Sequence, residues 1–126
     1  MKKSLVSYLE WMKQNEIDVS FLTSTDNVFY LSGFYCEPHE RLLGLLLFQE
    51  TDPILVIPSM EKEDAVASGW EFEIIGYSDI DDPWKLIDKA VKKATKLYLY
   101  AITKLYAKYV DFYIANFPGM IQAGLR

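Results

Sequence analysis

Apolar positions in this chain alternate between helical spacing and short continuous runs. Residues 3–14 place apolar side chains on one face of a predicted helix, at Leu5, Tyr8, Leu9 and Met12. Residues 18–23 are rich in β-branched and aromatic side chains and predict a short strand. The Ser, Thr and Asp residues at 24–26 then offer N-caps for a short helix, which Gly33 is placed to close.

Two apolar runs separated by a turn occupy the middle of the chain. Leu42–Phe48 is almost wholly apolar, which is typical of a strand covered on both faces. Gln49–Asp52 predicts a hairpin turn, and Pro53–Ile57 predicts the returning strand. These two runs therefore predict an antiparallel pair in the middle of a sheet.

The alternation continues after the hairpin. Ser59 predicts the N-cap of a helix that Gly69 stops, and the partly alternating run 70–77 predicts a strand. Asp82 and Pro83 predict a sharp helix start, because Asp suits the N-cap and Pro suits the first helical position. The apolar face of this helix comprises Trp84, Ile87, Val91 and Ala94.

Three further elements are expected near the C-terminus: a strand over 96–101, a helix over 102–113 and a short strand over 120–122. The whole order favours an α/β fold, a three-layer sandwich with a central mixed β-sheet flanked by helices. The sheet is expected to be mixed because of the hairpin at 49–52. We find no internal repeat or linker, so residues 1–126 are expected to form a single domain.

Composition narrows the function classes. The content of 51% hydrophobic and 25% charged residues is that of a globular protein. The net charge is −5, and no stripe of Lys and Arg interleaves with aromatics, which disfavours nucleic acid as a partner. The longest apolar run is far shorter than the roughly 20 residues of a membrane helix. One Cys excludes an internal disulfide and fits a reducing compartment, so we expect a cytoplasmic protein.

The chain lacks the common catalytic motifs. It contains no Gly-x-Gly-x-x-Gly, P-loop, Cys-x-x-Cys or His-Glu-x-x-His pattern, and one His and one Cys do not form the usual zinc sites. The count of acidic residues leaves a carboxylate metal site open. A nucleophile pair of Cys36 and His39 is disfavoured, because it would need a fixed geometry and a third, orienting group. No catalytic residue and no metal ligand are therefore assigned in this chain.

The loop after Gly33 concentrates the polar chemistry. Glu37, His39, Glu40 and Arg41 cluster where a predicted loop meets the strand at 42–48. They supply a proton switch near neutral pH, carboxylate acceptors and a planar cationic fork. Taken alone, such a cluster fits either a solvated turn or a binding loop on a rigid scaffold.

A family resemblance weighs on this choice. The motif Asn-x-x-Tyr-Leu-Ser-Gly-Phe at 27–34, followed by Glu-Pro-His-Glu-Arg at 37–41, resembles the N-terminal domain of Xaa-Pro dipeptidases (prolidases) and Xaa-Pro aminopeptidases. In those enzymes this domain is called the creatinase/prolidase N-terminal domain. The segment 71–84 is also similar to bacterial prolidases. The resemblance covers essentially the whole chain and weakens over 98–117.

The resemblance implies a role in a larger enzyme. Members of the family are metallopeptidases that cleave the bond between an N-terminal residue and Pro, with two divalent ions (Mn, Co or Zn) held in a C-terminal catalytic domain. That domain is expected to be absent from this chain, which would be an inactive N-terminal domain. Its implied partners are its own C-terminal catalytic domain, a second subunit in a homodimer and a proline-containing peptide.

By residue-wise match, the resemblance gives Glu37, His39, Glu40 and Arg41 a substrate-binding role in the partner subunit's pocket. Arg41 would pair with a carboxylate, His39 would contact the substrate or tune the pH response, and the two Glu residues would bias substrate choice by charge. A dimer contact is the alternative role for the loop. Two alternatives stay open for the chain: a non-catalytic peptide- or protein-binding module of the same fold, and an independent small α/β protein with its own ligand.

Overall fold

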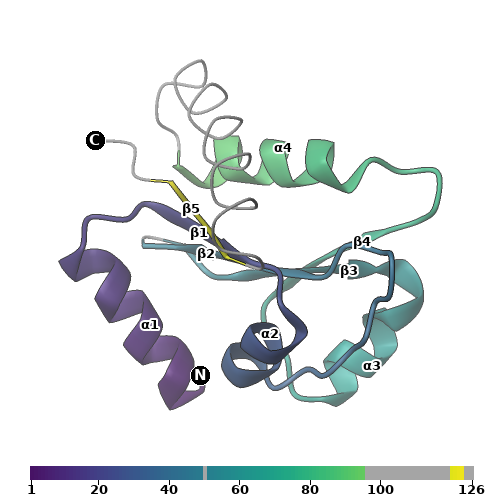
Figure 1. The fold of residues 1–126 in the computed structure, drawn as a ribbon, viewed down its shortest axis with the longest axis horizontal. Helices are drawn as coiled ribbons and strands as arrows, with labels where there is room; N and C mark the ends of the chain where they lie inside the picture. Colours follow the sequence, from purple (N-terminus) through teal and green to yellow (C-terminus); the bar gives the residue numbers. More distant parts are fainter. Residues whose placement is uncertain (50, 96–119, 124–126) are drawn as a thin grey trace.

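The computed structural model describes residues 1–49, 51–95 and 120–123 (Figure 1). Five strands and four α-helices, with one short 3₁₀ helix, make up this part of the chain. In chain order they are α1 (Lys3–Gln14), β1 (Val19–Leu22), α2 (Thr25–Ser32), β2 (Gly44–Phe48), β3 (Ile54–Pro58), η1 (Ser59–Glu61), α3 (Lys62–Ala67), β4 (Glu73–Tyr77), α4 (Pro83–Thr95) and β5 (Met120–Ala123).

The strands form one mixed sheet in the order β4-β3-β2-β1-β5. Strands β1 and β2, β2 and β3, and β1 and β5 pair antiparallel, whereas β3 and β4 pair parallel. Helices α1, α2 and α3 cover one face of the sheet and α4 lies over the other (Figure 1). The predicted three-layer sandwich with a mixed central sheet is therefore confirmed.

The two faces of the sheet carry two separate cores. Leu45 and Leu47 of β2 pack under the helices α1–α3, whereas Leu46 and Phe48 pack under α4 with Ile87. Because successive side chains of a strand point to opposite faces, a strand buried on both sides must be apolar at every position. This explains the continuous apolar run at 42–48 and confirms its interpretation.

Local signals at the helix ends are confirmed. The Ser24 hydroxyl accepts a hydrogen bond from the Asn27 N–H at 3.1 Å at the start of α2. Gly33 ends α2 with a φ of 81°, and its N–H donates to the Phe29 carbonyl at 2.9 Å. The Asp82 carboxylate accepts from the Trp84 N–H at 3.0 Å at the start of α4.

Two predicted boundaries are wrong. The chain leaves β3 through the tight η1 turn, so α3 begins only at Lys62 and Ser59 caps nothing with its side chain. Ser59 lies directly against Gly76 of β4, since a Cβ on that glycine would lie 3.3 Å from the Ser59 Cα. The strand predicted from residue 70 begins at Glu73, because Trp70 instead buries its ring and donates its indole N–H to the Glu73 carbonyl at 3.0 Å.

The C-terminal predictions divide into two groups. The strand expected at 120–122 is confirmed as β5, which pairs antiparallel with β1. The strand expected at 96–101 and the helix expected at 102–113 lie outside the described residues. Within the described residues, none of the helices combines the length and the apolar character required to cross a bilayer.

A glycine permits the close packing of the core under α4. A Cβ placed on Gly44 would lie 2.1 Å and 2.2 Å from two ring carbons of Phe21. The Phe21 ring also meets the ring of Trp84 edge-on, at a centroid distance of 5.8 Å. The Phe21 ring therefore lies directly against Gly44 and also contacts Trp84, so a side chain added at residue 44 would have to displace it.

We expect Gly44→Ala to lower the free energy of unfolding by about 1–3 kcal/mol, because an added methyl group overpacks the core. Urea denaturation of the 126-residue chain measures this change. In a Phe21→Leu background the same Gly44→Ala substitution is expected to cost less, because the smaller side chain gives way. An equal cost in both backgrounds would contradict the packing account.

Candidate functional site

The predicted polar loop connects α2 to β2 and is held by buried side chains at both ends. Phe34 and Cys36 lie in the core under α1–α3, and Leu43 is buried next to the start of β2. The four predicted site residues between these anchors are all exposed: Glu37, His39, Glu40 and Arg41. The loop thus presents its polar side chains from a fixed base.

A tight turn shapes the middle of this loop. His39 has a φ of 57°, in the left-handed region, and the Arg41 N–H donates to the Pro38 carbonyl at 3.0 Å. Such a φ is uncommon for residues other than glycine, although His adopts it more readily than most. The turn brings Pro38 and Arg41 together and fixes the direction in which the chain enters β2.

Three of the four predicted residues line one open cleft of about 450 Å³. Its walls are residues 23–25, at the junction of β1 and α2, and residues 37–39 and 41–43 of the loop. Glu37, His39 and Arg41 are therefore brought together, whereas Glu40 does not line this cleft. The volume is in the range of small-molecule sites, but the cleft is largely open to solvent.

A tyrosine holds Glu37 from within the loop. The Tyr35 hydroxyl donates a hydrogen bond to the Glu37 carboxylate at 2.6 Å, and this bond raises the pKa of Tyr35 above its ordinary value. The Tyr35 ring also meets the ring of Phe29 edge-on at 5.8 Å. The Glu37 carboxylate is thus hydrogen-bonded to Tyr35, whose ring packs on Phe29 of α2.

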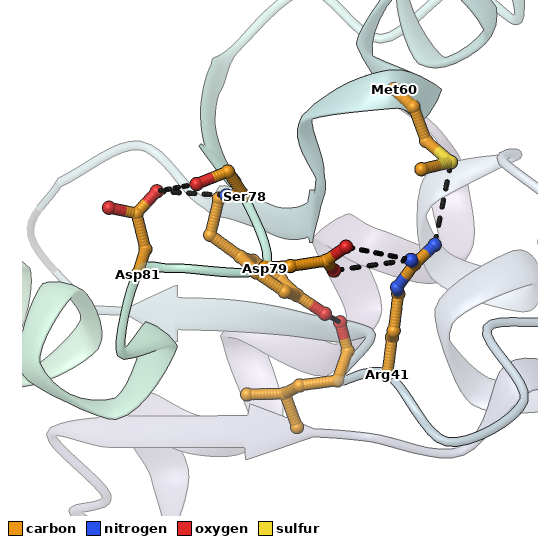
Figure 2. Close-up of polar contacts among 7 residues, drawn as sticks. Arg41, Met60, Ser78, Asp79 and Asp81 are labelled. Carbon is orange, nitrogen blue, oxygen red and sulfur yellow. Dashed lines mark hydrogen bonds and ion pairs between the residues drawn. The ribbon is translucent and has the colours of Figure 1, made fainter.

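Arg41 contacts residues far away in the sequence, as Figure 2 shows. Its Nη2 lies 3.1 Å and 3.2 Å from the two carboxylate oxygens of Asp79, and its Nη1 lies 3.5 Å from the sulfur of Met60. The sequence analysis missed both partners. No local pattern marks Asp79 as a partner of Arg41, because the two residues are separated by 38 positions.

Strand register explains why these segments meet. Gly44 at the start of β2 pairs with Val56 of β3, and Pro58 at the end of β3 pairs with Tyr77 at the end of β4. The chain entering β2 and the chain leaving β4 therefore lie at the same end of the sheet. A hydrogen bond from the Tyr77 hydroxyl to the Leu42 carbonyl joins them. Burial raises the pKa of Tyr77 above its ordinary value.

The turn that carries Asp79 is stabilised by its own bonds. The Asp81 carboxylate accepts from the Ser78 N–H at 2.8 Å and from the Ser78 hydroxyl at 3.0 Å, and these bonds lower the pKa of Asp81 (Figure 2). The Asp81 N–H donates to the Ser78 carbonyl at 3.1 Å. Residues 78–81 thus form a closed turn that does not depend on Arg41.

The structure does not favour a nucleophile or a metal site in this loop. Cys36 is buried in the core and burial raises the pKa of its thiol, which opposes formation of the nucleophilic thiolate. His39, in contrast, is exposed. Among the residues described, we find no group of three His, Cys, Asp or Glu side chains suited to a metal ion. The exposed charged and polar side chains of the loop are groups that can bind a ligand.

Comparison with known proteins identifies relatives over most of this chain. The family model described as Creatinase/Prolidase N-terminal domain matches residues 6–104. The Bacillus subtilis (strain 168) protein YkvY is 48% identical over 95 residues, which cover 75% of this chain and 26% of that protein. The Xaa-Pro dipeptidase of Lactobacillus delbrueckii subsp. lactis is 38% identical over 88 residues, which cover 70% of this chain and 24% of that protein.

A solved structure gives the same picture. The N-terminal domain of Xaa-Pro dipeptidase from Lactobacillus brevis is similar to this chain with a TM-score of 0.69 and 34% identity, over 73% of this chain and 69% of that one. The curated relatives are much longer. This chain spans about a quarter of their length, 26% and 24% for the two named above.

The turn at 78–81 is expected to depend on pH. A carboxyl group whose pKa is lower in the folded chain than its ordinary value of 3.8 stabilises the fold above that value and loses this contribution as the pH falls through the lowered pKa. We expect Asp81→Asn to lower the free energy of unfolding at pH 7. The difference from wild type should shrink as the pH falls below 3.8.

Urea denaturation at a series of pH values from 7 to about 3 tests this sign. Asp88→Asn is the control, because Asp88 pairs with Lys92 on α4 and takes no part in the turn. A difference between wild type and Asp81→Asn that grows on acidification would contradict the assignment.

Proposed function

Because this chain belongs to the creatinase/prolidase N-terminal domain family, we propose that it is the non-catalytic N-terminal domain of a metal-dependent Xaa-Pro peptidase of the proline dipeptidase type. The observation that carries the proposal is the family match over residues 6–104 combined with a polar cleft built by the loop 37–41. The domain would act in a cytoplasmic homodimer, attached to its own C-terminal catalytic domain.

The loop would supply substrate contacts to the catalytic pocket of the partner subunit. Glu37, His39 and Arg41 line a cleft that is largely open to solvent, so a second surface is needed to enclose a small ligand. Arg41 would bind the carboxylate of a proline-containing dipeptide, because a guanidinium matches a carboxylate in shape and charge. His39 would add a contact to the substrate, and Glu37 and Glu40 would influence substrate choice by charge.

The metal chemistry is proposed to lie in the catalytic domain. Two divalent ions, Mn, Co or Zn, would activate water and polarise the scissile carbonyl there. The residues described here do not fit such a centre, since they offer no group of three ligands. The role of this domain would be to bind and enclose the substrate, and a pocket of dipeptide size needs such a lid to exclude water.

One observation favours the alternative of a binding module without catalysis. Phe29, Tyr30 and Tyr35 all expose about half or more of their surface, on α2 and the start of the loop. Exposed aromatic side chains are common in protein–protein interfaces, and the same surface would serve a peptide-binding domain. The two functions differ in whether the full-length protein hydrolyses a peptide.

We expect the full-length protein with manganese to hydrolyse the dipeptide Leu-Pro. We expect the 126-residue chain alone to show no hydrolysis, because its described residues offer no group of three potential metal ligands. Release of free proline measures both. Cleavage of longer Xaa-Pro peptides would indicate an aminopeptidase instead. Absence of hydrolysis by the full-length protein would favour the binding module, and hydrolysis by the short chain that is lost in His39→Ala would overturn the non-catalytic role.

We also expect Arg41→Ala in the full-length enzyme to raise KM for Leu-Pro by about tenfold or more, since it removes a charged hydrogen bond to the substrate. The value of kcat should change little, because this bond is made equally in the ground state and the transition state. Steady-state kinetics separates the two parameters. A fall in kcat with unchanged KM would contradict a binding role for Arg41.

A further inference from the structure

The ion pair between Arg41 and Asp79 joins the two segments that meet at this end of the sheet. Asp79 places both carboxylate oxygens near a single nitrogen of the guanidinium, Nη2. Among the described residues, the partner recorded for the other terminal nitrogen, Nη1, is the Met60 sulfur at 3.5 Å. A thioether is a weak acceptor, so this side of the guanidinium can still take a stronger partner.

The turn that carries Asp79 is held in place by its own contacts. Asp79 lies inside the turn that the Ser78–Asp81 bonds close, and the Asp82 carboxylate caps α4 immediately after this turn. The strand before the turn is tied to Leu42 by the Tyr77 hydroxyl. The backbone that carries Asp79 is therefore held by contacts that do not include Arg41, whereas the Asp79 carboxylate itself contacts Arg41.

Arg41 is the member that needs support. Its backbone is held by the Pro38 carbonyl, but its side chain is 40% exposed and has several rotatable bonds. Fixing such a side chain on ligand binding costs conformational entropy, and a contact made beforehand reduces that cost. Asp79 supplies such a contact while leaving the Nη1 side of the guanidinium directed to a weak acceptor.

From this geometry we propose that Asp79 is a positioning residue, which holds the Arg41 guanidinium in place for the free carboxylate of a proline-containing dipeptide. The inference rests on the proposed function and assigns that site a residue outside the loop. Repulsion between Asp79 and the substrate carboxylate acts in the opposite direction. The exposure of the Asp79 side chain, 77%, weakens this repulsion, and the sign of the change in KM on removing the Asp79 charge tells the two effects apart.

The test uses four forms of the full-length enzyme: wild type, Asp79→Asn, Arg41→Ala and the double variant. Asp79→Asn is expected to raise KM for Leu-Pro by about threefold to fivefold with kcat unchanged, which is the scale of an exposed ion pair. In the Arg41→Ala background the same substitution should change neither parameter, because the residue acts only through Arg41.

Asp88→Asn is the matched control, since it removes another surface ion pair, the 2.7 Å contact with Lys92 on α4. It should leave KM and kcat unchanged. A rise in KM that persists when Arg41 is absent would show a structural role for Asp79 and overturn the proposal. A lower KM in Asp79→Asn would show that Asp79 competes with the substrate, which would also overturn it.

The result also separates this inference from the proposed function. Hydrolysis of Leu-Pro by wild type, with Asp79→Asn indistinguishable from it, overturns the positioning role and leaves the peptidase assignment standing. No hydrolysis by the wild-type enzyme overturns both. A KM effect that is present in wild type and absent in the Arg41→Ala background supports both.

Discussion

Burial of the middle strands on both faces is the constraint on which the rest of this structure depends. Strands β2 and β3 are buried at every position, so helices must cover the sheet on both sides. Neither of these two strands carries a polar side chain, so polar groups near them lie beyond the strand ends. The candidate site lies at one such end, where the chain enters β2 and leaves β4.

The same constraint makes the end of the sheet a precise support. Adjacent side chains of β2 belong to two different cores, so a shift of register by one residue would reverse both. The register therefore fixes the distance between the segment that holds Arg41 and the turn that holds Asp79. The Tyr77 hydroxyl adds a direct bond between the two, and the exposed loop inherits its position from the buried sheet.

The structural features that were predicted correctly from the sequence are those that depend on neighbouring residues. The caps at Ser24, Gly33 and Asp82 were predicted because each acts within a few positions of the helix end. Sequence reasoning failed at Ser59 and at the start of β4, where packing against another strand or a buried Trp decides the boundary.

The candidate site follows the same division between local and distant contacts. The family motif pointed to the loop, and three of its four polar residues line the cleft. Glu40 lies on the same tight turn as these residues but does not line the cleft. Asp79 and Met60 could not be found from the sequence, because their contacts with Arg41 depend on how β2, β3 and β4 align.

The exposure of the Arg41–Asp79 pair is informative about its use. Removing one partner of a buried ion pair lowers the stability of a protein by several kcal/mol, and the buried charges are not available to a ligand. An exposed pair contributes at most about 1 kcal/mol and leaves the guanidinium accessible to other anions. This pair adds little to the stability of the fold, yet it joins two segments whose positions other contacts already fix. Such a contact is better suited to orienting Arg41 toward a ligand than to holding the domain together.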